Sequence, residues 1–226
     1  MVERQDAKML AAEMAAEIAA LPTHNTASER AVVQRYAQLI MPEDAGFVLA
    51  LAQELLETHA CRWQAYELIA GHPTAFQRMG PAELETFGRG IDSWWAVDSF
   101  ARSLAGPAWC AGQAPDVLFH GWAASPDRWW RRAALVSTVA WNVRSLGGRG
   151  DAPRTLAVCR LLAADGDDMV VKALSWALRM LATFDPAAVG AFLAEYDPVL
   201  AGRVKREVRH KLATGLKNPR YVKRKP

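Results

Sequence analysis

The residues best suited to chemistry lie between Ile91 and Ala105, where two adjacent tryptophans precede an aspartate. Asp92 or Ser93 can cap a helix that begins here. On such a helix Trp94 and Asp98 are four residues apart and share one face. An indole ring beside a carboxylate attracts positive charge, so this face suits a cationic ligand. The structural alternative is a buried tryptophan beside an aspartate that caps a helix or pairs with an arginine.

Two later segments place tryptophans among basic residues. One is the sequence Trp-Trp-Arg-Arg at 129–132, at the start of an expected helix. In the other, Lys172 and Trp176 are four apart and Trp176 and Arg179 are three apart. Such a helix face can hold phosphates and stack on sugars or bases. Each segment alone fits better with a core tryptophan beside a basic side chain whose stem lies along the helix.

The charge of the chain is divided unevenly. Of the 226 residues, 27 are Lys or Arg and 24 are Asp or Glu. Ten of the basic residues and one acid, Glu207, lie from Gly202 onward, which leaves a net charge of −6 on the first 201 residues. An acidic body with a basic end indicates a polyanionic partner approached from one side. A solvated tail that only keeps the protein soluble would give the same pattern.

Other kinds of site find little support in the sequence. The five histidines are dispersed and lack the spacing of metal ligands, and no glycine-rich phosphate loop or nucleophile elbow is present. We therefore expect no metal and no cofactor. Three widely spaced cysteines predict unpaired thiols in a reducing cytoplasm. No segment has the uncharged apolar length of a membrane span, and the first residues lack the basic-then-apolar pattern expected of a signal peptide.

Helix signals follow one another along the whole chain. Proline at first turns and Gly or Asp turns separate segments with apolar residues three and four apart. Apolar residues make up 51 % of the sequence and charged residues 23 %, as in an ordinary folded domain. Besides the stretch described first, helices are expected over residues 1–20, 28–40, 42–59, 62–71, 81–87, 108–122, 129–146, 153–164, 169–183, 186–196 and 198–215.

The expected fold is all-α. Helices come in pairs at intervals of roughly 40 residues, the period of HEAT-type arrays. The alternative is a globular helical bundle. We predict a single HEAT-like domain, an α-solenoid, over residues 1–226 with a basic tail from about residue 217.

Taken together, the three segments resemble the AlkD-like DNA alkylation repair family, monofunctional glycosylases built from HEAT-like repeats. The match rests on Ser-Trp-Trp-Ala-Val-Asp-Ser at 93–99, Trp-Arg-Arg-Ala-Ala at 130–134 and Lys-Ala-Leu-Ser-Trp-Ala-Leu-Arg at 172–179. It covers residues 51–212. The family has one more residue between its double tryptophan and its aspartate, so Trp95 competes with Trp94 for one role. Tyr36 is the candidate for a third cleft aromatic.

The resemblance implies a role for each matched residue. Asp98 would be the catalytic aspartate, and Trp94 and Trp176 the cleft tryptophans. The substrate would be double-stranded DNA that carries purines alkylated at N3 or N7, bound by a monomer on a concave face. A flexible basic loop at 147–150 would lie near that DNA. The residues expected to hold DNA are Arg132, Lys172, Arg179, Arg144, Arg149, Lys205, Arg206 and Arg209.

Two interpretations of Asp98 make opposite predictions. As a catalytic carboxylate, Asp98 could be replaced by Asn with the fold nearly intact and most activity lost. As a structural partner of Arg132, it could be neutralised only at the expense of stability. A non-catalytic HEAT-like scaffold that binds DNA or a protein is the rival function.

Overall fold

The computed structural model describes residues 6–216, and every regular element among them is helical. The prediction of an all-α helical array is thus confirmed. The predicted basic tail from about residue 217 lies outside the described residues. Within the described range, no helix is both long and apolar enough to cross a bilayer.

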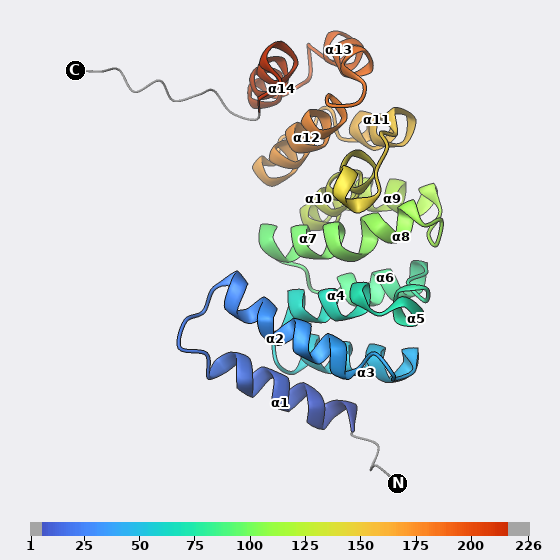
Figure 1. Cartoon of the computed structure of the whole chain (residues 1–226). Coiled ribbons are helices and arrows are strands. Elements are labelled where there is room, and N and C mark those ends of the chain that lie inside the picture. The colour runs from blue at the N-terminus through green and yellow to red at the C-terminus, as the bar shows by residue number, and fades with distance from the viewer. Residues whose placement is uncertain (1–5, 217–226) are drawn as a thin grey trace, which may run out of the picture. The chain divides into compact units, whose positions relative to one another are not determined.

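The described residues form two compact units. The first comprises residues 6–90 and 103–114, and the second residues 91–102 and 115–216. The single domain over 1–226 stays a prediction. In the first unit α3 packs on α1 and α4, and α2 packs on both α1 and α4. Its helices (Figure 1) are α1 Ala7–Ala19, α2 Thr26–Leu39, α3 Ala45–Glu57, α4 Arg62–Gly71, α5 Pro73–Phe76, α6 Pro81–Gly88 and α8 Gly106–Cys110.

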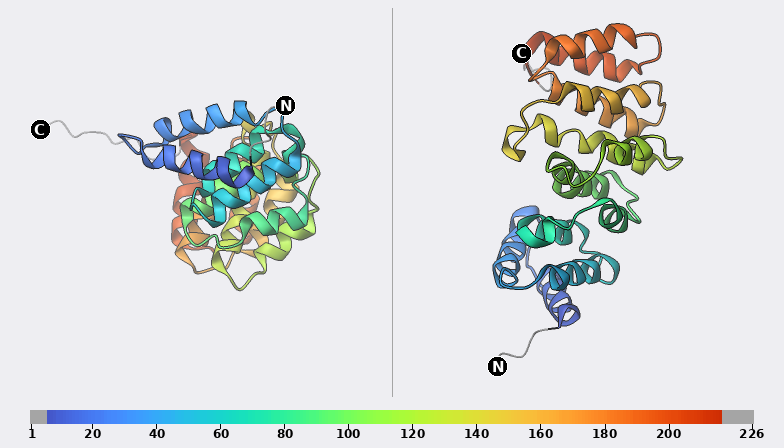
Figure 2. Two further views of the ribbon diagram at one scale, coloured as in Figure 1. Left: turned by 90° about the horizontal axis from the view of Figure 1, so that it is seen from below. Right: turned by 90° about the vertical axis from the view of Figure 1, so that its right-hand side faces the viewer.

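The second unit is a two-layered stack of helices. Its elements are α7 Trp94–Phe100, α9 Asp116–Ala123, α10 Arg128–Ser137, α11 Ala152–Leu161, α12 Asp168–Leu181, α13 Pro186–Glu195 and α14 Gly202–Thr214. One layer runs α7, α10, α12, α14, in which each helix packs on the next (Figure 1). The other contains α9, α11 and α13, each joined to the first layer by a short turn. Successive helix pairs are visible in the right panel of Figure 2.

Aspartate caps fix where four helices of the second unit begin. A capping carboxylate accepts a hydrogen bond from a backbone N–H that has no partner within the helix. Each such bond is 2.8–2.9 Å long, and each starts a helix close to where a turn was expected. The capping residues are Asp127 for α10, Asp151 for α11, Asp167 for α12 and Asp185 for α13.

Aromatic side chains join α7, α9 and α10 in the core of the second unit. The Trp122 ring lies 4.8 Å from that of Trp130 and 4.9 Å from that of Phe119, measured between centroids. Phe100 lies 5.9 Å from Trp122 and 6.1 Å from Trp130. Since Phe100 is fully buried, its packing fixes which face of α7 points outward.

Several expected helix bounds were wrong, and side chains account for some of them. The helix expected to continue to residue 146 ends at Ser137, where two short 3₁₀ turns follow. There Thr138 Oγ1 donates to the Leu135 carbonyl at 2.7 Å, and Asn142 Nδ2 donates to the Thr138 carbonyl at 3.0 Å. Side chains that bond the local backbone compete with the helix.

At four prolines the predicted helix boundary was wrong. Pro42 does not begin a helix, because Asp44 caps α3 through the backbone N–H of Phe47 at 2.9 Å. Pro73, expected as a break, opens the short α5, and Pro198 precedes α14 by a turn. The single helix expected over residues 108–122 is divided between the end of α8 and most of α9. Pro107, expected to precede that helix, lies inside α8.

Candidate functional site

The α7 helix presents both tryptophans at the surface. Ala96, Val97 and Phe100 are buried, which turns the opposite side of the helix outward. Trp94 is 57 % exposed and Trp95 is 46 % exposed. Burial of a tryptophan ring contributes a large part of a core's stability, so two exposed rings side by side are unusual in a soluble domain. This exposure favours a surface that meets a ligand or partner.

Asp98 lies one turn from Trp94 and forms a bidentate ion pair with Arg132 of α10. Arg132 Nε donates to Oδ1 and Nη2 donates to Oδ2, each at 2.9 Å. Arg132 Nη1 donates to the Met169 carbonyl of α12 at 2.6 Å. The pair therefore links three successive helices of one layer: α7, α10 and α12.

The two partners differ in their access to solvent. The Arg132 side chain is 6 % exposed, whereas that of Asp98 is 20 % exposed. No other hydrogen bond to the Asp98 carboxylate is found within residues 6–216. Each carboxylate oxygen can accept more than one hydrogen bond, so Asp98 retains capacity toward the solvent. Burial raises the pKa of Asp98, and the hydrogen bonds and charge of Arg132 oppose that rise.

This arrangement revises two expectations. Arg132 was expected to contact DNA phosphates, but its guanidinium is buried and bonded to Asp98 and Met169. The Asp98→Asn variant was expected to leave the fold nearly intact. Because neutralisation of Asp98 would leave the Arg132 charge buried without its partner, we now expect a loss of stability as well.

The α12 helix carries the remaining residues of the predicted cleft. Helix geometry, with 100° of rotation per residue, places four residues on one side of α12: Met169, Lys172, Trp176 and Arg179. Trp176 is half-buried and lies about 10 Å along the axis from Met169, whose carbonyl accepts from Arg132. Lys172 Nζ lies 2.6 Å from Asp168 Oδ2, and both side chains of this ion pair are exposed. The α12 face thus runs past the Asp98–Arg132 pair.

Near the end of α12, Arg179 meets a residue that the sequence analysis did not assign, Glu207 of α14. Arg179 Nη2 lies 3.7 Å from Glu207 Oε2, and Ser175 Oγ donates to the same oxygen at 2.6 Å. Glu207 is the single acid after Gly202, a signal that could have marked it. Its partner could not be read from spacing, since 28 residues separate it from Arg179.

The predicted basic residues of α14 are only partly available for DNA. Lys205 Nζ donates to the Asp197 carbonyl at 3.0 Å, and Arg209 Nη2 lies 2.6 Å from Asp197 Oδ1. Arg206 is exposed. Of these three, Arg206 has the side chain least engaged with the protein.

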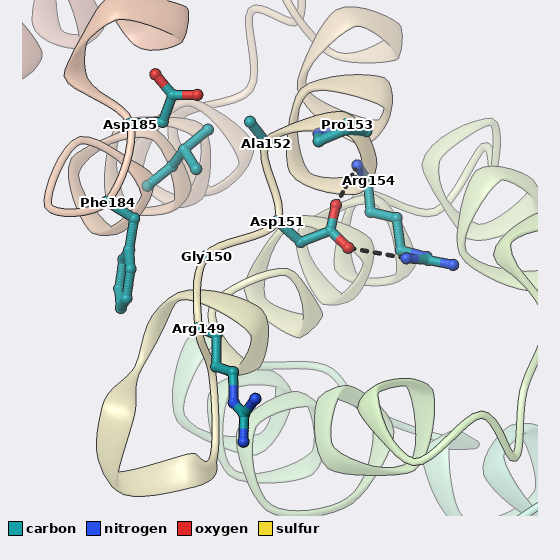
Figure 3. Close-up of a pocket in the computed structure, with 9 residues that line it drawn as sticks. Arg149, Gly150, Asp151, Ala152, Pro153, Arg154, Phe184 and Asp185 are labelled. Carbon is teal, nitrogen blue, oxygen red and sulfur yellow. Dashed lines mark hydrogen bonds and ion pairs between the residues drawn. The ribbon is translucent and has the colours of Figure 1, made fainter.

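The predicted loop at 147–150 is held by specific contacts. The Gly150 N–H donates to the Trp141 carbonyl at 2.9 Å, and a cavity of ≈ 490 Å³ opens beside the loop. Figure 3 shows Arg149 and Phe184 at this cavity. Arg149 and Arg144 are exposed, and the Arg144 guanidinium lies 5.6 Å from the centre of the Phe184 ring. The expected contacts of both arginines with DNA stay a prediction.

Replacement of Gly148 by Ala is expected to lower the free energy of unfolding by about 2 kcal/mol or more. A Cβ atom there would overlap the Ala140 carbonyl oxygen and lie 2.6 Å from the Trp141 carbonyl group, and both are parts of the backbone. Urea denaturation measures the loss. Gly166→Ala is the control, because a Cβ at that turn glycine meets nothing within 4 Å. Equal losses in the two variants would contradict this account.

No group of three or more His, Cys, Asp or Glu residues in the described part of the chain could hold a metal ion. Cys61 and Cys159 are buried, and Cys110 is partly exposed. No disulfide joins these three cysteines. Cellular location and oligomeric state stay predictions.

Comparison with protein families gives a match over most of the chain. The family model described as DNA alkylation repair enzyme matches residues 3–212, nearly the whole chain. No curated protein and no solved structure matches. The matched range contains all three segments from which the resemblance was inferred.

Proposed function

Because the chain belongs to the DNA alkylation repair enzyme family, we propose that it is a DNA glycosylase that releases N3- or N7-alkylated purines from double-stranded DNA. One observation carries this proposal. A solvent-accessible carboxylate, Asp98, accepts two hydrogen bonds from a buried arginine and lies one helical turn from an exposed tryptophan.

The chemistry of the substrate fits this arrangement. A purine alkylated at N3 or N7 carries a positive charge, which weakens its bond to the deoxyribose. As the base departs, positive charge develops on the sugar, and a fixed carboxylate stabilises that charge. The same carboxylate can accept a hydrogen bond from the water that attacks the sugar carbon. Because two hydrogen bonds from Arg132 already orient the carboxylate, it needs little reorganisation when the positive charge develops on the sugar.

The exposed rings add attraction for the cationic lesion. An indole face contributes about 0.5–1 kcal/mol to a cation at an exposed site. Trp94 is four residues from Asp98 and Trp95 is three, so both side chains neighbour it on α7 and both remain candidates for this contact. Trp176 would act from α12. In this proposal Arg132 is a positioning residue, because it acts through Asp98.

Base release from a duplex that contains N7-methylguanine tests the proposal. We expect the wild-type protein to release the free base and leave an abasic site, with no metal or cofactor added. Binding to the same duplex is measured in parallel. Binding without base release would overturn the glycosylase and favour the scaffold that binds DNA.

DNA binding is expected to weaken steeply as the salt concentration rises. Each phosphate contact contributes about 0.9 to the slope of log K against log salt for duplex DNA. Since Arg132 is buried, we expect exposed basic residues to make these contacts. Arg206→Ala should therefore lower the slope by about one contact. Arg160→Ala removes the same charge from α11, in the other layer, and should leave the slope unchanged.

A further inference from the structure

Glu207 occupies an isolated acidic position on a basic helix. The helix α14 packs on α12, and Val204 and Val208 are its buried residues. Glu207 lies beside Val208 and is 30 % exposed. It is the one acid among the 25 residues from Gly202 onward, ten of which are Lys or Arg. A carboxylate in this position reduces the attraction of the helix for a polyanion.

The contacts of Glu207 reach both α12 and its own helix. Ser175 Oγ, which is fully buried, donates to Oε2 at 2.6 Å. Arg179 Nη2 lies 3.7 Å from the same oxygen, and Arg203 Nη1 lies 3.7 Å from Oε1. One carboxylate is therefore shared between two guanidinium groups.

Arg179 is held less firmly than Arg132. Its Nε donates at 3.2 Å to the carbonyl and the hydroxyl of Ser175, both on its own helix. Its Nη groups make no hydrogen bond among the described residues, and their ion pair with Glu207 exceeds hydrogen-bond length. The Arg179 side chain is 12 % exposed. A half-buried guanidinium in this state has unused donors, which a phosphate could satisfy in bidentate geometry.

We propose that Glu207 pairs with Arg179 in the free protein and competes with a DNA phosphate for that guanidinium. The inference rests on the proposed function, since it takes DNA as the ligand of this surface. A phosphate that contacts the Nη groups of Arg179 would approach the Glu207 carboxylate. The two negative charges would repel each other. Each binding event then includes the exchange of one anion for another. Glu207 thereby limits affinity for undamaged duplex DNA.

The experiment is a double-mutant cycle on binding to an undamaged duplex at low salt. Glu207→Gln keeps an acceptor for Ser175 Oγ and removes the charge. We expect it to tighten binding by about three- to tenfold. Arg179→Met keeps the apolar stem and removes the guanidinium. In that background Glu207→Gln should change the affinity less, because the guanidinium that the substitution would free for a phosphate is gone.

The matched control is Glu195→Gln, which adds the same charge at an exposed position on α13, in the other layer. An equal gain from Glu195→Gln would overturn the proposal, because net charge alone would then explain the result. An unchanged affinity for Glu207→Gln, or an undiminished gain in the Arg179→Met background, would also overturn it. The absence of any binding to the duplex would overturn the proposal too. A protein that binds duplex DNA but releases no base would overturn the glycosylase alone.

Discussion

Replacement of Asp98 by Asn is expected to lower single-turnover base release from an N7-methylguanine duplex by at least about 100-fold. The amide has nearly the same shape as the carboxylate but no charge to stabilise a cationic sugar. Since the missing interaction forms mainly in the transition state, the rate should fall much more than the affinity for the duplex.

The same substitution has a second expected effect, on stability. Arg132 Nη2 and Nε both donate to Asp98, and an amide nitrogen cannot accept from either. One buried donor loses its partner. We expect the free energy of unfolding to fall by about 1–3 kcal/mol, which urea denaturation measures.

A neighbouring ion pair supplies the control for that loss. Arg131 Nε donates to Asp165 Oδ2 at 2.7 Å, and the two side chains are 20 % and 12 % exposed. Asp165→Asn should therefore destabilise the second unit by a similar amount and leave base release intact. Full base release by Asp98→Asn protein would end the catalytic role of Asp98. Loss of activity in both variants would mean that stability alone explains it.

Local signals predicted the helical fold well. Capping aspartates such as Asp127 and Asp167 act within three residues of the helix that they begin, so the sequence around them contains the whole interaction. The spacing of Trp94 and Asp98 likewise follows from helix geometry. Pro42 and Pro73 show the limit of such signals. Proline fits both the first turn of a helix and the loop before one, and the side chains around it decide between them.

The site itself depends on contacts between distant parts of the chain. The pair of Asp98 and Arg132 was considered from the sequence only as the structural alternative, and it joins residues 34 apart. Burial of Arg132 follows from the packing of α10 between α7 and α12, which no single segment encodes. Arg132 was therefore expected at the DNA and lies instead behind the carboxylate. Glu207 was missed for the same reason.

The second large effect is expected at Arg132. Arg132→Met removes three hydrogen bonds, including the one to the Met169 carbonyl, and leaves the Asp98 carboxylate without its partner. Breaking a buried ion pair from one side is costly, and since Asp98 is 20 % exposed we expect a loss of about 2–4 kcal/mol in the free energy of unfolding. Arg131→Met, one residue earlier on α10, removes a guanidinium that is 20 % exposed, against 6 % for Arg132. It should cost less, because Asp165 keeps the hydrogen bond from the backbone N–H of Asp167 at 2.8 Å.

A pH profile separates this structural effect from the role of Arg132 in positioning Asp98. Burial raises the pKa of Asp98 above the ordinary value near 4, and Arg132 opposes the rise. Base release that needs the carboxylate should fall as the pH drops through that pKa. In Arg132→Met the opposing influence is gone, so the pKa rises further and the acid limb of the single-turnover rate moves to higher pH. Arg131→Met should leave the limb in place. An acid limb unmoved by Arg132→Met would show that Arg132 does not set the charge state of the group on which catalysis depends.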